Sequence, residues 1–238
     1  EGFKFVAGTG PVRALMSLLG LVSFTAMPYA VLMPLFADQI LHGGAQALGL
    51  LMGCSGVGAL GGAVTLAMRK TLKGLSSWVA ISCAGFGLSL LLFSFSRMLW
   101  LSAVLLVPAG FCMMIQMASS NTLIQSMVPD RLRGRVMSVY AMTFMGMAPL
   151  GALLAGSLAH KLGAPMTVGI GGVVAIMGAA VFGSKLPVIR SAAREMIVAQ
   201  QMVGGDPPQE MTGRVFSKNG DDATLSNPEA QPASFDVR

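Results

Sequence analysis

Charged side chains are scarce in this sequence. The 238 residues contain 16 Lys and Arg and 10 Asp and Glu, so that 11% are charged, whereas about 25% is usual for a soluble domain. Hydrophobic side chains make up 54%, and the mean hydropathy is +0.70. These values exclude a water-soluble globular protein and indicate a membrane protein.

Cysteine and histidine are also rare, with three Cys and two His in the chain. Cys54, Cys83 and Cys112 lie in apolar stretches without paired spacing. The simplest interpretation is that they are small packing residues, and a disulfide or metal role is the alternative. We therefore expect no metal site, no cofactor and no catalytic residue.

The charged residues leave six long uncharged gaps. Each gap exceeds the roughly 20 apolar residues that cross a bilayer as a helix. The pattern predicts an all-α polytopic membrane bundle with six transmembrane helices over residues 1–186. The predicted spans are 14–37, 46–68, 75–95, 98–122, 136–159 and 164–184.

Lys and Arg are distributed unevenly between the two predicted sides of the membrane. Arg97 and Lys161 fall on one side and eleven basic residues on the other. Translocated loops are poor in basic residues, so we expect both termini to be cytoplasmic. The net charge of +6 then reflects topology, and no nucleic-acid partner is expected. The eleven are Lys4, Arg13, Arg69, Lys70, Lys73, Arg131, Arg133, Arg135, Lys185, Arg190 and Arg194.

The end of the chain differs from the predicted bundle. Apolar residues recur at helical spacing over 187–203, which predicts an amphipathic helix on the cytoplasmic surface, with partner binding as the alternative role. Residues 204–238 are rich in Gly, Pro, Ser, Asn and Asp, and we expect disorder there. The missing initial Met leads us to expect a processed or truncated chain.

Small residues and prolines recur within the predicted spans. Close helix contact in lipid depends on small residues at helical spacing, and we expect such contacts at five positions of the second and fifth spans. Two three-span units with similar Gly and Pro placement suggest an inverted repeat, although polytopic helices are generally rich in both residues. The expected packing residues are Gly58, Gly62, Pro149, Gly151 and Gly156.

An acid stands beside three arginines at the predicted cytoplasmic ends of two spans. Asp130 precedes Arg131, Arg133 and Arg135, with Gly134 between the last two. An acid in this place could pair with a basic side chain in one conformation and release it in another, which would make the segment a gating loop. The alternative is a positive-inside anchor with an incidental carboxylate.

The most specific stretch is residues 128–165. It resembles the major facilitator superfamily, and within it the enterobactin-exporter-like group of bacterial efflux permeases. The likeness rests on Pro129-Asp130-x-x-Arg133-Gly134-Arg135-Val136-Met137-Ser138, followed by Pro149-Leu150-Gly151 and Ala155-Gly156. It extends loosely over residues 1 to 190, and the signature loop at 62–70 keeps its basic end but lacks the aspartate.

The resemblance implies the carboxyl-terminal half of a twelve-helix secondary transporter in the bacterial inner membrane. Its partners would be the lipid bilayer, a missing amino-terminal six-helix half and a small-molecule substrate such as a siderophore or drug-like compound. Transport would proceed by alternating access. The first and fourth spans would line the central pathway.

No Asp, Glu, Lys or Arg lies in the interior of any predicted span, so a proton carrier would have to lie elsewhere. Neutral polar residues remain for substrate contact, and hydrogen bonding between helices is their alternative role. Thr25 and Tyr29 are one turn apart in the first span, and four residues share one face of the fourth. These four are Cys112, Gln116, Ser119 and Ser120.

Other membrane functions are less consistent with the residues. Gly53-Cys54-Ser55-Gly56 resembles an intramembrane serine protease string, but His42 and His160 are predicted at loop edges, away from Ser55. The inner loops are too short for the membrane domain of an ATP-driven exporter, and a charged ring typical of a channel is missing. We therefore expect a transporter and not an enzyme.

Overall fold

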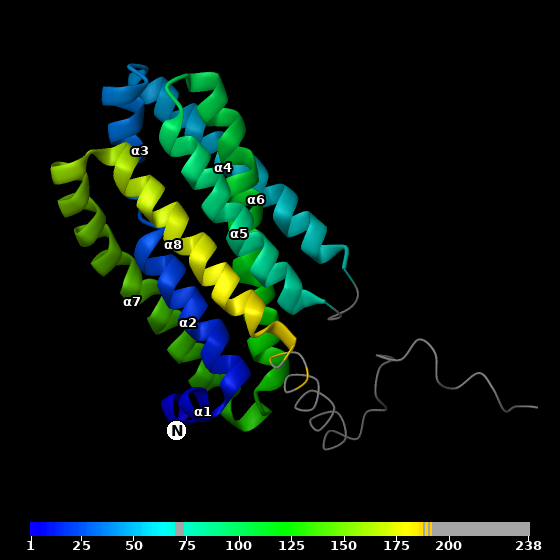
Figure 1. Ribbon diagram of the computed structural model, residues 1–238. Coiled ribbons are helices and arrows are strands. Elements are labelled where there is room, and N and C mark those ends of the chain that lie inside the picture. Colours follow the sequence, from blue (N-terminus) through cyan, green and yellow to red (C-terminus); the bar gives the residue numbers. More distant parts are fainter. Residues whose placement is uncertain (70–73, 188, 190, 192–238) are drawn as a thin grey trace, which may run out of the picture.

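A computed structural model of the chain describes residues 1–69, 74–187, 189 and 191, and every regular element in that part is a helix (Figure 1). Most of the helices run along the length of one bundle. The elements are α1 (Gly2–Gly8), α2 (Gly10–Thr25), α3 (Tyr29–Leu35), the π-helical turn η1 (Phe36–Ile40), α4 (Gly44–Ala67), α5 (Leu75–Phe95), α6 (Leu99–Met127), α7 (Asp130–Leu162) and α8 (Ala164–Ser184).

Six helical segments are long and apolar enough to cross a membrane. They are Gly10–Ile40, Gly44–Ala67, Leu75–Phe95, Leu99–Met127, Asp130–Leu162 and Ala164–Ser184. This confirms the predicted all-α bundle of six spans. The helices α6 and α7 contain 29 and 33 residues, so they are longer than the membrane requires.

The first span is interrupted between α2 and α3. Pro28 has no N–H to donate to the Phe24 carbonyl, and the Tyr29 N–H bonds to the Ala26 carbonyl at 3.2 Å. The Met27 N–H reaches back to Val22 at 2.9 Å. Pro34 then removes another donor, and the helix widens into η1 directly after it. Two prolines therefore divide one predicted span into three helical pieces.

The predicted gating loop is helical and not a loop. Pro129 has an extended backbone, with ψ 143°, and α7 begins at the next residue, Asp130. Proline at this position is compatible with a helix start, and an acid in the first turn is favoured by the helix dipole. The connection between α6 and α7 is therefore reduced to Val128 and Pro129.

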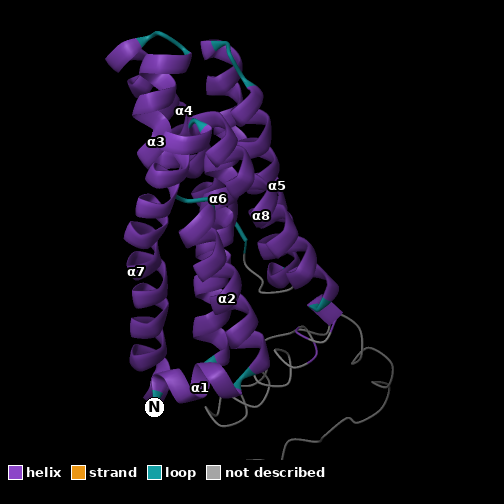
Figure 2. Ribbon diagram, turned by 60° about the vertical axis from the view of Figure 1, so that its left-hand side comes forward, coloured by secondary structure: helices purple, strands orange, loops and turns teal. Residues whose placement is uncertain are grey.

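Both views place α1 and the end of α8 at the same end of the bundle (Figures 1 and 2). Inside the bundle, α4 packs on α6, α5 contacts both α6 and α8, and α2 contacts α7 and α8. Because the number of spans is even, the last span ends on the side of the membrane where the first one begins.

The proposed division at residue 187 falls largely outside the described residues. Of the predicted surface helix over 187–203, the structure describes Pro187, Ile189 and Ser191, and the predicted disordered tail at 204–238 lies wholly outside it. Both assignments stay predictions.

Candidate functional site

Thr25 and Tyr29 flank the interruption in the first span. The Thr25 hydroxyl donates to the Leu21 carbonyl at 2.7 Å, within its own helix. The Tyr29 hydroxyl lies 3.2 Å from the Ser55 hydroxyl of α4, and its ring meets Phe86 of α5 edge-on at 5.8 Å. Tyr29 therefore joins the first span to α4 and α5.

The four polar residues predicted on one face of α6 share a face that is turned into the bundle. Gln116, Ser119 and Ser120 are buried, with at most 2% exposure, and Cys112 is half-buried. Among the described residues, Gln116 Oε1 and Ser119 Oγ have no hydrogen-bond partner. The burial places this face between helices in the present conformation, so substrate contact there stays a prediction.

The first turns of α7 carry the predicted gating residues. Arg133 Nη2 lies 2.7 Å from Asp130 Oδ1, one turn away on the same helix. Arg135 pairs with Glu1, which connects the start of the chain to α7, and the Ser138 hydroxyl donates to the Gly134 carbonyl at 2.9 Å. Both ion pairs are exposed and contribute little stability by themselves. The structure thus pairs Asp130 with Arg133, and gating stays a prediction.

The five expected packing residues fall on different faces of their helices. Gly58 and Gly62 lie against the α6 backbone, and a Cβ at Gly62 would be 2.8 Å from the Phe111 carbonyl. Gly151 lies against Phe24 and Pro28 at the interruption, where its Cβ would be 2.9 Å from Pro28 Cγ. Pro149 is exposed, and space around Gly156 is open to 4 Å within the described residues. Gly156 therefore makes no close helix contact with any of the described residues.

The sequence analysis missed a glycine contact between α5 and α8. A Cβ at Gly87 would lie 2.5 Å from the Gly172 carbonyl, and one at Gly172 would lie 2.6 Å from the Gly87 carbonyl. The glycine-rich run at 169–172 was the available signal. Close approach of these helices depends on both glycines.

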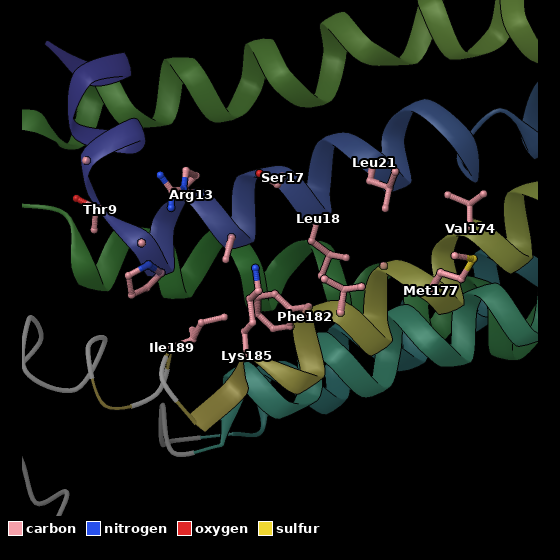
Figure 3. A pocket seen from close by; sticks show the side chains of 16 residues that line it. Thr9, Arg13, Ser17, Leu18, Leu21, Val174, Met177, Phe182, Lys185 and Ile189 are labelled. Carbon is pink, nitrogen blue, oxygen red and sulfur yellow. The ribbon is translucent and has the colours of Figure 1, made fainter.

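A groove of about 1050 Å³ opens between α2 and α8, near the end of the bundle that carries α1 (Figure 3). Arg13 and Lys185 lie at one end of the groove, and Leu21, Val174 and Met177 lie at the other. The sequence analysis counted both cations as topology signals only. That both line one groove depends on the register of two helices that are far apart in the chain.

The described residues offer no support for metal or protease chemistry. They contain no group of three His, Cys, Asp or Glu side chains that could hold a metal ion, and the three cysteines are free thiols. The Ser55 hydroxyl is hydrogen-bonded to the Tyr29 hydroxyl, and no histidine in the described part of the chain is bonded to it.

A family model described as transmembrane secretion effector, of the major facilitator type, matches residues 1–210. The chain belongs to this family. No match was found among the curated proteins or among the solved structures. The transmembrane secretion effector family is a family of transporters, so the six apolar spans belong to a multi-pass membrane transporter.

Proposed function

We propose that these residues form the carboxyl-terminal six-helix half of an efflux permease, which exports a small molecule by alternating access against an amino-terminal half. The family match supports transport, and the resemblance at 128–165 supports the enterobactin-exporter-like group. Siderophores and drug-like compounds are the substrate class that this group implies.

The observation that carries the proposal is the exposure of α4 and α7. The most apolar windows of these two helices are 22% buried, compared with 50% in α5. Space beside Gly49, Gly53 and Gly56 of α4, and beside Gly146 of α7, is open to 4 Å within the described residues. Small residues on a membrane helix allow another helix to approach closely, so these exposed surfaces fit a second bundle.

The large exposed side chains of the same two helices are apolar and adaptable. Val57 and Leu60 of α4 are exposed, as are Met142 and Met145 of α7. Methionine fits irregular apolar surfaces, including those of permissive ligand sites. A cavity between two bundles would therefore be apolar on this side, with a coupling acid supplied by the other half.

Localisation forms part of the proposal. The basic residues at both chain ends and at the start of α7 support an orientation with both termini in the cytoplasm. The resemblance to bacterial permeases supports the inner membrane. Changes in the Asp130–Arg133 pair during the transport cycle would bias one conformation over another.

The test is site-specific photo-crosslinking of the protein that carries these residues, in its native membrane. A photoreactive side chain replaces Val57 on α4, and the control replaces Ile81 on α5; these side chains are 64% and 70% exposed. We expect Val57 to crosslink to polypeptide outside the 238 residues, while Ile81 reacts with lipid. Crosslinking of Val57 to the same helix of a second copy, or to lipid alone, would overturn the half-transporter proposal.

A further inference from the structure

We propose that the groove between α2 and α8 binds one anionic phospholipid, with its phosphate at Arg13 and Lys185 and an acyl chain along the apolar walls. This site is separate from the exposed surfaces of α4 and α7 that support the proposed transport function. The groove does not enter that proposal, in which Arg13 and Lys185 count only as two of the basic residues that support the orientation.

The antiparallel packing of α2 and α8 places Arg13 and Lys185 at the same height along the bundle. Two glycines of α8 show which residues of the two helices lie opposite each other. Gly171 lies beside the Thr25 carbonyl, and a Cβ at Gly178 would lie 3.3 Å from Leu18 Cδ1. Continuing this register toward the end of α8 puts Lys185 opposite Arg13. In Figure 3 the Lys185 side chain extends from α8 toward α2.

Both basic groups retain donors for an anion. Arg13 Nη1 donates one hydrogen bond, to the Ala7 carbonyl at 3.2 Å, and a guanidinium has further N–H groups. Within the described part of the chain, neither Arg13 nor Lys185 forms an ion pair. Thr9 and Ser17 also line the groove. A phosphate is the anion that such a set of donors suits, because Arg binds it through paired hydrogen bonds.

The depth of the groove fits one leaflet of a bilayer. Arg13 and Leu21 are eight positions apart on α2, and Lys185 and Val174 are eleven apart on α8. At 1.5 Å per residue these are about 12 Å and 17 Å, close to half of a hydrocarbon core of about 30 Å. An acyl chain attached to a phosphate at the cations would therefore run along Leu21 and Val174.

The groove is also open sideways to the bilayer. Met177 and Val181 line it and are 61% and 59% exposed. Its volume of about 1050 Å³ is at the upper end of ligand sites, which hold about 300–1,000 Å³. A lipid can enter from the membrane plane, and the charge at one end selects an anionic headgroup.

The test measures lipid binding by native mass spectrometry of the protein that carries these residues, purified in detergent. The probes are phosphatidylglycerol, phosphatidylcholine and glycerol 3-phosphate. We expect preferential retention of phosphatidylglycerol. The double variant R13Q/K185Q should weaken its binding about 25-fold, because each basic residue near an anionic headgroup contributes roughly fivefold. The matched control R97Q/K161Q, which removes two basic residues elsewhere in the chain, should bind as the unmodified protein does.

A second pair of variants tests the acyl-chain end with both cations in place. Val181→Trp fills the groove and should reduce phosphatidylglycerol binding, whereas Ile81→Trp, on exposed α5 surface, should not. Equal retention of phosphatidylcholine, or full competition by glycerol 3-phosphate, would overturn the lipid assignment. Phosphatidylglycerol binding that appears only after deletion of residues 192–238 would show that the chain itself fills the groove, and would also overturn it. Since the readout is lipid retention, failure here leaves the crosslinking test of transport unaffected.

Discussion

Gly87 and Gly172 set the distance between α5 and α8. A Cβ on either residue would lie 2.5 or 2.6 Å from the carbonyl oxygen of the other, which is closer than real Cβ atoms approach backbone. Lipid provides no hydrophobic driving force between helices, so association depends on this kind of close packing. A single methyl group should therefore change the stability of the bundle.

We predict that Gly172→Ala destabilises the protein by about 1–3 kcal/mol, the usual cost of inserting atoms into a packed site. The backbone of α5 would have to move, because the contact is with a carbonyl oxygen and not with a flexible side chain. Thermal unfolding in detergent measures the change.

Gly183→Ala on the same helix is the matched control. Space around Gly183 is open to 4 Å among the described residues, and Ala is favoured over Gly in a helix by about 1 kcal/mol. This variant should be neutral or slightly stabilised. Equal melting temperatures for the two variants would contradict the packing argument.

At the scale of helices, α7 differs most from its predicted form. Its 33 residues begin at Asp130, so the acidic and basic residues expected in a loop occupy its first two turns. The uncharged stretch predicted that this span begins at residue 136. Hydropathy identifies only the part of a helix that lies in lipid, so it does not detect a polar extension into water. The polar extension follows from local signals, namely Pro129 before the helix and an acid in its first turn.

We predict that Asp130→Asn lowers transport with little effect on folding. The carboxylate is 87% exposed and pairs with Arg133 at 2.7 Å, so its loss should cost less than about 1 kcal/mol of stability. If the pair biases one conformation, the transport rate should fall roughly two- to tenfold. Efflux assays and melting curves on the same preparation separate the two effects.

Arg131→Gln is the control, since it removes a charge from the same turn without breaking the recorded pair. Equal transport by Asp130→Asn and the unmodified protein would leave the segment as a positive-inside anchor. A large loss of stability in Asp130→Asn would instead indicate a structural role.

At the scale of the whole molecule, α1 and the end of α8 lie at the same end of the bundle (Figure 2). Eleven basic residues were assigned to that side from the sequence, and Arg13, Arg135 and Lys185 lie in or next to the helix ends there. Retention of these charges in the cytoplasm would fix the orientation of the bundle.

We predict that tags at both termini are protected from external protease in intact spheroplasts. A tag inserted after Arg97, between α5 and α6, should be cleaved under the same conditions. Immunoblotting before and after membrane permeabilisation measures both. Termini on opposite sides of the membrane would refute the assigned topology.

Charge spacing alone predicted all six spans, because long uncharged stretches are stable in lipid only as helices. The spacing of small residues singled out Gly58 and Gly62, which lie against the backbone of α6. The same spacing could not tell that Gly156 faces outward, because the rotation of a helix depends on its neighbours. The groove was beyond prediction for a similar reason: Arg13 and Lys185 line one groove only through the register of α2 and α8.

The interruption at Pro28 has a mechanical consequence. Bending a straight helix requires backbone hydrogen bonds to break. At this position one of them is already missing, because Pro28 has no N–H to donate to the Phe24 carbonyl. Gly151 of α7 and Gly171 of α8 pack directly against this joint, because a Cβ on Gly151 would overlap the Phe24 carbonyl and one on Gly171 would overlap the Thr25 carbonyl. Any movement of the first span about Pro28 would therefore have to be accompanied by movement of α7 and α8.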